Sequence, residues 1–161
     1  MPKITVKPHE AMTIVGLKYH GKNQAGEIPQ LWGALMERAA DIQKRDYSVR
    51  AAYGVSIMGE DFDETMIFDY IAGFPVLEPP EATPEDMGQF RIPAGSYAVI
   101  TVPNLESISQ AFDAVNRWIA QSTEYAVDLS SGNFNFELYG EEFMPDEGSE
   151  KFYIYVPVKE K

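Results

Sequence analysis

Cysteine is absent from the 161 residues of this chain, and long apolar runs are absent as well. Without cysteine there are no disulfide bonds, no thiolate metal sites and no cysteine nucleophile, which fits a reducing compartment. No apolar run approaches the ~20 residues that a helix needs to cross a bilayer. The start Met1-Pro2-Lys3 is not followed by the apolar stretch of a signal peptide. We therefore expect a cytoplasmic protein that does not bind membranes.

Basic residues are scarce too. The chain has 13 Lys and Arg against 25 Asp and Glu, and a net charge of −12. The basic residues are scattered, whereas nucleic-acid binding needs a basic patch, so direct binding of nucleic acid is not expected. The summed negative field favours cationic small molecules over anions. The two histidines, His9 and His20, have no third ligand at metal spacing, and no phosphate loop or dinucleotide fingerprint is present. We expect neither a metal site nor a cofactor.

The chain does contain an internal repeat. Residues 28–35 (IPQLWGAL) match residues 108–115 (ISQAFDAV) at an offset of 80. The segment SIMGEDF at 56–62 matches ELYGEEF at 137–143 at an offset of 81, and FPV at 74–76 matches VPV at 156–158 at an offset of 82. Three matches in the same order predict a duplication of about 80 residues.

Apolar spacing predicts the same elements in each repeat. Helical spacing covers 28–43 and 108–121, with Pro29 in the first turn of one helix and a Ser107–Gln110 capping box at the start of the other. Strands are predicted at 3–19, 50–58, 65–74, 89–102, 132–140 and 151–158. This βαββ order, twice, predicts an α+β fold: an antiparallel sheet with pseudo-twofold symmetry, helices on one side and a central ligand groove. We expect a single domain over 1–161, with repeat one at about 1–76, a proline-rich linker at about 77–87 and repeat two at about 88–161.

The strand 132–140 suggests which side chains face the groove. Because alternate residues of a strand share a face, Phe134, Phe136 and Leu138 are expected under the helices, and Asn135, Glu137 and Tyr139 on the other face. On the neighbouring strand Tyr153 and Tyr155 are expected beside Glu137, and the first repeat offers Met58 and Ile71 at the matching places. Trp32 and Trp118 are expected in the core or at the groove rim.

Two interpretations of Glu137 follow from this pattern. It is either an exposed strand carboxylate in water or a charged anchor among aromatic rings. A carboxylate among aromatics is costly to bury without a partner. A cationic ligand would neutralise the carboxylate, and stacking on the rings adds ~0.5–2 kcal/mol of cation–π attraction.

Five segments spread over nearly the whole chain form an ordered set: IVGL at 14–17, IPQLW at 28–32, FDYIAG at 68–73, IPAGSY at 92–97 and FELY at 136–139. Together they resemble the GyrI-like effector-binding domain, which also occurs in bacterial transcription activators of the AraC and MerR types. The resemblance implies a duplicated βαββ fold that binds bulky aromatic, often cationic, drug-like compounds. The family's groove glutamate falls on Glu137, and its aromatic lining on Trp32, Tyr97, Tyr139 and Tyr155. No basic recognition helix is left over, so a complete one-component regulator is not expected.

Three functions remain open. The leading hypothesis is multidrug sensing or sequestration, with ligand-binding residues Glu137, Tyr139, Trp32, Tyr97, Tyr155, Tyr153, Met58, Ile71 and Trp118. The second is a hydrolase of cyclopropane-containing alkylating compounds, with Glu137 and Tyr139 as the catalytic pair. The third is a protein-interaction module such as a gyrase inhibitor. The oligomeric state is left open by the sequence.

Overall fold

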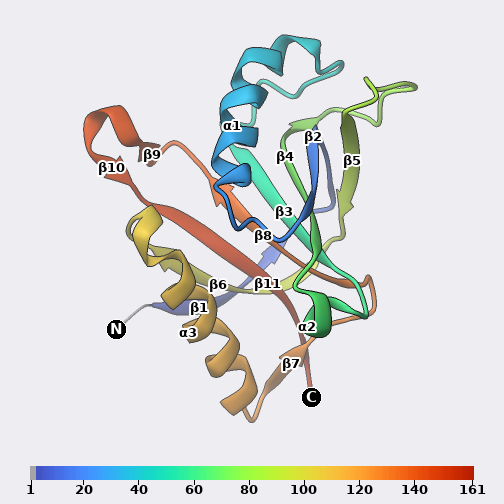
Figure 1. Cartoon of the computed structure of the whole chain (residues 1–161). Coiled ribbons are helices and arrows are strands. Elements are labelled where there is room, and N and C mark those ends of the chain that lie inside the picture. Colours follow the sequence, from blue (N-terminus) through green and yellow to red (C-terminus); the bar gives the residue numbers. More distant parts are fainter. Residues whose placement is uncertain (1–2) are drawn as a thin grey trace.

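One antiparallel sheet runs through both repeats in the computed structural model, which describes residues 3–161 (Figure 1). The first repeat contributes β1 (Ile4–His9), β2 (Met12–Gly21), α1 (Glu27–Arg38), β3 (Ala52–Met58), the short α2 (Phe62–Thr65) and β4 (Phe68–Val76). The second contributes β5 (Met87–Ile92), β6 (Gly95–Val102), α3 (Ile108–Gln121), β7 (Tyr125–Val127), β8 (Asn133–Tyr139) and β11 (Phe152–Glu160). The strand order is β1-β6-β11-β8-β3-β4-β2-β5, with β7 added beside β11. A small hairpin of β9 (Phe143–Met144) and β10 (Ser149–Glu150) projects from the second repeat.

The strand order confirms the duplicated fold. It reads the same from either edge when each strand is replaced by its counterpart in the other repeat. The backbone N–H of Asp46 donates to the carbonyl of Pro75 at 2.9 Å, and the N–H of Asp128 donates to the carbonyl of Pro157 at 2.9 Å, so the same bond recurs 82 residues later. The repeats meet where β3 pairs with β8, and each also gives its first strand to the other: β1 pairs with β6, and β5 with β2.

That exchange of strands corrects two of the predicted elements. The long strands expected at 3–19 and 89–102 are each two strands, β1–β2 and β5–β6. Each is interrupted by a short turn because its first part pairs in the other half of the sheet.

The two main helices begin and end differently from one another. Helix α3 has the predicted bounds, 108–121, whereas α1 ends at Arg38 and only a 3₁₀ turn, Ala39–Asp41, follows. The capping box expected at Ser107 is wrong. Asn104 caps this segment instead, since its Oδ1 accepts hydrogen bonds from the N–H and hydroxyl of Ser107 at 3.1 and 2.9 Å. No helix within residues 3–161 has the length and apolar character to span a membrane.

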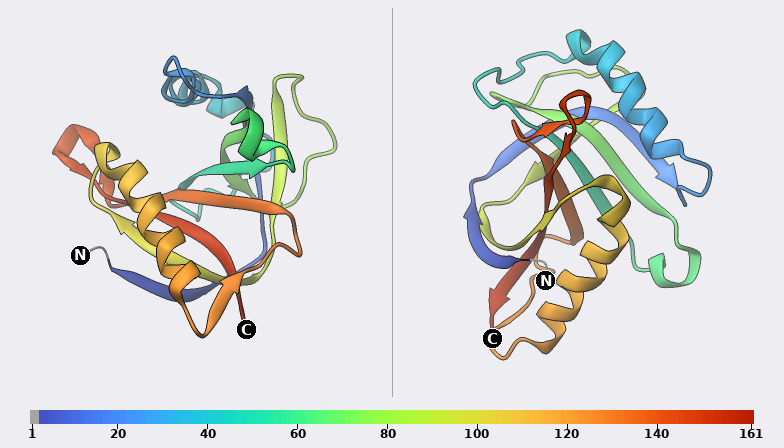
Figure 2. Two further views of the ribbon diagram at one scale, coloured as in Figure 1. Left: turned by 60° about the horizontal axis from the view of Figure 1, so that its bottom comes forward. Right: turned by 90° about the vertical axis from the view of Figure 1, so that its left-hand side faces the viewer.

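Both helices pack on the same face of the sheet, each over its own repeat (Figure 2). Leu35 of α1 contacts a cluster from β2 and β4 that includes Leu17 and Ala72. Val115 of α3 lies in a cluster from β6 and β11 that includes Ile100 and Ile154. We call this the helix face.

The opposite face is also buried, because the sheet curls over it. Phe90 in the edge strand β5 lies 5.2 Å from Phe134 in β8, ring centre to ring centre, although three strands separate β5 from β8. From the other edge, the His9 ring lies 6.0 Å from Tyr53 in β3. A third apolar cluster therefore fills this inner face without any helix.

Candidate functional site

Glu137 is a buried carboxylate in the middle of the sheet, with 6% of its surface exposed. Its cross-strand neighbours are Gly54 on β3 and Ile154 on β11. Since Ile154 packs with α3, Glu137 lies on the helix face. The prediction that it lies on the face opposite the helices is therefore wrong.

The same register corrects the predicted environment of the anchor. Phe134, Phe136 and Leu138 were expected under the helices, but they lie on the inner face. Tyr153 pairs with Leu138 and Tyr155 with Phe136, so neither tyrosine shares a face with Glu137. The expectation assumed that only the helix face is buried, whereas the curl of the sheet buries both.

Three aromatic side chains surround Glu137 on the helix face. The hydroxyls of Tyr139 and Tyr70 both donate to Oε1 of Glu137, at 2.7 and 2.9 Å. Trp32 of α1 donates its Nε1–H to the Tyr70 hydroxyl at 3.0 Å, and its ring lies 5.3 Å from that of Tyr139. These four residues form what we call the carboxylate cluster, with side chains from α1, β4 and β8.

A glycine beside this cluster leaves room for it. A Cβ at Gly54 would lie 2.0 Å from the Tyr70 hydroxyl oxygen and 2.9 Å from Glu137 Oε1, well inside contact distance. Any side chain at this position would push the tyrosine off the carboxylate. The site therefore needs glycine at the position cross-strand to Glu137.

Burial shifts the protonation equilibria of the cluster. Burial raises the pKa of Glu137 above its ordinary value, while the hydrogen bonds from Tyr139 and Tyr70 act in the opposite direction. Burial and the nearby carboxylate raise the pKa of both tyrosines, so both remain protonated donors. Among residues 3–161, no Lys, Arg or His forms an ion pair with Glu137. Its charge is therefore compensated by hydroxyl dipoles alone.

The structure brings together Glu137, Tyr139 and Trp32 and places the other predicted site residues elsewhere. Tyr97 is buried on the inner face, where its hydroxyl donates to the carbonyl of Pro93 at 2.6 Å. Ile71 is cross-strand to Val55 of the inner-face cluster.

The remaining predicted residues also lie outside the carboxylate cluster. Tyr153 donates to a carboxylate oxygen of Glu142 at 2.6 Å, and Tyr155 stacks on Phe136 at 4.7 Å. Met58 is the last residue of β3. Trp118, in the last turn of α3, stacks on Tyr125 of β7 with the ring centres 6.3 Å apart.

Tyr70 is the member of the carboxylate cluster that was not predicted from the sequence. It lies in the FDYIAG segment at 68–73, one of the segments that carry the family resemblance. A tyrosine within an apolar strand is a signal in itself, because a buried hydroxyl needs a hydrogen-bond partner. With the β3–β4 register unknown, nothing in the sequence pointed that hydroxyl at Glu137.

A cleft of about 370 Å³ lies beside the carboxylate cluster on the helix face. Tyr139 forms one wall of the cleft, and Phe74 of β4 and Ala52 of β3 form others. The loop between α1 and β3 supplies the rest, including Arg45 and Tyr47. Tyr139 thus lies between the open cleft and the buried carboxylate of Glu137. Within the described residues, no group of three or more His, Cys, Asp or Glu side chains could hold a metal ion.

A duplicated antiparallel sheet with both main helices on one face is the architecture of an effector-binding domain. The chain belongs to the family described as Cass2, the integron-associated effector binding proteins, whose pattern matches residues 5–158. It is 28% identical over 150 residues to the transcriptional regulator BrlR of Pseudomonas aeruginosa. The match covers 92% of this chain and 52% of BrlR, so the chain spans about half the length of that regulator.

Two solved structures show the same fold. SAV2435 bound to tetraphenylphosphonium has a TM-score of 0.70 and 21% identity, with 98% of this chain and 94% of that one covered. The C-terminal domain of EcmrR has a TM-score of 0.71 and 12% identity, with 100% and 99% covered. At these identities the similarity establishes the architecture.

Proposed function

We propose that this protein binds bulky aromatic cations and that Glu137 supplies the counter-charge. The observation that carries the proposal is a carboxylate that is 6% exposed and has no cationic partner within the described part of the chain. Burying a carboxylate in this way is costly. A bound cation would remove that cost, and the Trp32 and Tyr139 rings offer aromatic faces beside it.

Two further facts support this choice of ligand. The chain carries a net charge of −12, which attracts cations over a distance. SAV2435, which shares the fold, is described as bound to tetraphenylphosphonium, an aromatic cation. Because the chain belongs to a family of effector-binding proteins, we expect it to sense or sequester such compounds.

A ligand must displace part of the cluster to reach Glu137. Trp32 contacts both tyrosines that donate to the carboxylate. Trp32 is carried by α1, in which only Leu35 is fully buried. We therefore expect α1 and the Trp32 ring to move on binding, while the sheet stays in place.

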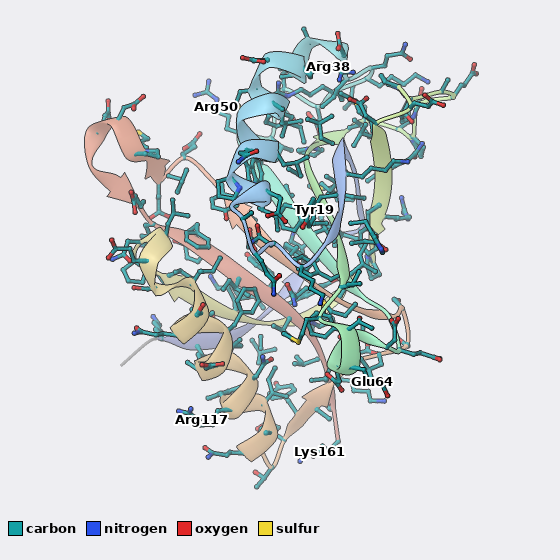
Figure 3. The ribbon with its side chains drawn as sticks, viewed as in Figure 1. Tyr19, Arg38, Arg50, Glu64, Arg117 and Lys161 are labelled. Atoms are coloured by element: carbon teal, nitrogen blue, oxygen red, sulfur yellow. The ribbon has the colours of Figure 1, made fainter. Side chains whose placement is uncertain are left out.

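The test is a calorimetric titration that measures the affinity of the wild type and of Glu137→Gln for tetraphenylphosphonium. Loss of the counter-charge should weaken binding by about tenfold or more, since ~1.4 kcal/mol corresponds to tenfold. Glu64→Gln removes an equal charge from the exposed α2 (Figure 3) and should leave the affinity unchanged. Neutral triphenylphosphine oxide should bind the wild type weakly. Equal affinity of wild type and Glu137→Gln for the cation would refute the proposal.

Proton release gives an independent readout. A cation favours the ionised carboxylate, whereas burial raises the pKa of Glu137 in the free protein. At a pH between the pKa of Glu137 in the complex and its pKa in the free protein, binding should release a proton from this carboxyl. Calorimetry in buffers of different ionisation enthalpy measures this release, which should vanish in Glu137→Gln.

The hydrolase alternative draws less support from the geometry. Burial and the adjacent carboxylate raise the pKa of Tyr139, which makes this hydroxyl a weaker proton donor than an ordinary tyrosine. Turnover of a cyclopropane-containing electrophile that disappears in Glu137→Gln would nevertheless decide for catalysis.

A further inference from the structure

The cleft beside Tyr139 has a charge opposite to that of the carboxylate cluster. Two guanidinium groups, those of Arg45 and Arg50, line it in a protein that carries 25 acidic against 13 basic residues in all. Arg50 is largely exposed and lies 4.0 Å from Glu141, at the outer limit of an ion pair. Figure 3 shows Arg50 beside α1, on the opposite end of the molecule from Arg117 of α3.

Arg45 is held in place by both its backbone and its side chain. The segment around it is joined to the end of β4: Arg45 forms a bridge with Val76, and Leu77 donates its N–H to the carbonyl of Lys44 at 2.8 Å. The guanidinium carbon lies 3.7 Å from the ring centre of Phe74. An arginine stacked in this way has one face covered by the ring and keeps its in-plane N–H donors available.

Within residues 3–161, no carboxylate forms an ion pair with Arg45, and no side chain accepts a hydrogen bond from its guanidinium. A guanidinium whose donors lie in a plane matches a carboxylate with two parallel hydrogen bonds. This is the feature of the cleft that points to an anion.

Aromatic surface accompanies this charge. The Tyr47 ring lies 4.8 Å from the Arg45 guanidinium carbon and is 70% exposed, so it has little part in the core. Phe74 and Tyr139 form the inner wall. A volume of about 370 Å³ is at the lower end of the range of small-molecule sites.

We propose that this cleft is a second ligand site, distinct from Glu137, that binds aromatic carboxylates. The acid group would pair with Arg45, and the ring would lie against Tyr47 and Tyr139. Because the guanidinium groups repel cations, the ligand of this cleft differs in charge from the ligand proposed for Glu137. The inference rests on the cleft alone and does not depend on the proposed function.

The probe is 2-naphthoate, compared with the neutral 2-naphthamide on the wild-type protein by calorimetry. The two have nearly the same shape, but the amide replaces one charged carboxylate oxygen by a neutral NH2 group. Naphthoate should bind about tenfold or more tightly, and added salt should weaken its binding. Equal affinity for both compounds would overturn the proposal without any variant being needed.

Variants locate the site. Arg45→Gln should weaken naphthoate binding by about tenfold, while Arg117→Gln, which removes the same charge from an exposed position on α3, should have no effect. A thermal melt of Arg45→Gln checks that the loop has kept its structure. An equal loss in the Arg45 and Arg117 variants would show a general charge effect and refute the site.

Discussion

At the scale of single residues, Glu137 links the stability of the fold to pH. Burial raises its folded-state pKa above the ordinary value of 4.5, so the neutral carboxyl favours folding. This contribution is fully present below about pH 4.5 and is lost as the pH rises through the folded-state pKa. As the pH rises through this window, the free energy of unfolding of the wild type in urea should therefore fall relative to that of Glu137→Gln, whose side chain stays neutral.

The difference between the two proteins isolates this one group. The pKa of Asp86 is lowered by Arg38, and the pKa of Glu142 is lowered by the Tyr153 hydroxyl and then by Lys151. Both acids titrate identically in the two proteins. If the difference in unfolding free energy stays constant from pH 4 to 9, the carboxylate is not buried as the structure has it.

Asn135 offers a second prediction at this scale. Its Oδ1 is closed off from solvent and accepts no hydrogen bond within residues 3–161. A buried acceptor left unpaired costs about 1–3 kcal/mol. Asn135→Leu, which keeps four heavy side-chain atoms branched at Cγ, should therefore raise the free energy of unfolding by about 1 kcal/mol in urea titrations. Asn116→Leu makes the same change at an exposed position of α3 and should be close to neutral. A less stable Asn135→Leu protein would show that the amide makes bonds the structure lacks.

At the scale of elements, the two main helices are held with different strength. Three residues of α3 are fully buried, Ala111, Val115 and Ile119, but only Leu35 of α1 is. The entries of the two helices do not account for this difference, because Asn23 accepts from the N–H of Ile28 in α1 at 3.0 Å, as Asn104 accepts from Ser107 before α3. Amide hydrogens of α1 should therefore exchange at least about tenfold faster than those of α3, as followed by mass spectrometry. Equal protection of the two helices would contradict the idea that α1 gives way to admit a ligand.

How far the sequence could predict the structure also differs between elements. The duplication, the βαββ order and the bounds of α3 follow from apolar periodicity and internal matches, and the structure confirms them. The face of Glu137 did not follow, because alternation along β8 separates two sets of residues but does not say which set meets the helices. That choice is made by the curl of the sheet, which brings Phe90 against Phe134. Contacts of this kind join residues far apart in the chain and leave no local pattern. Tyr70 was missed for the same reason.

At the scale of the whole molecule, the exchange of first strands ties the two repeats together. In an isolated repeat one, β1 would lack its partner β6 and β2 would lack β5. The inner-face cluster draws on both repeats, from Ile14 and Tyr53 to Val99 and Phe136, so each half would expose apolar surface. We therefore expect the fragments 1–80 and 81–161, produced separately, to lack a cooperative thermal transition by circular dichroism.

The linker provides the control for that experiment. Leu77 and most of the residues after it up to Asp86 are exposed, and no strand lies in this segment. A protease site placed there and cut after folding severs the chain without removing a strand pair, so the nicked protein should keep its melting transition. Mixing the two separate fragments should restore the same transition, because the missing strands then become available. A fragment that melts cooperatively alone would mean that one repeat folds without strands from the other. The carboxylate cluster, in which Tyr70 of one repeat donates to Glu137 of the other, would then join two autonomous units.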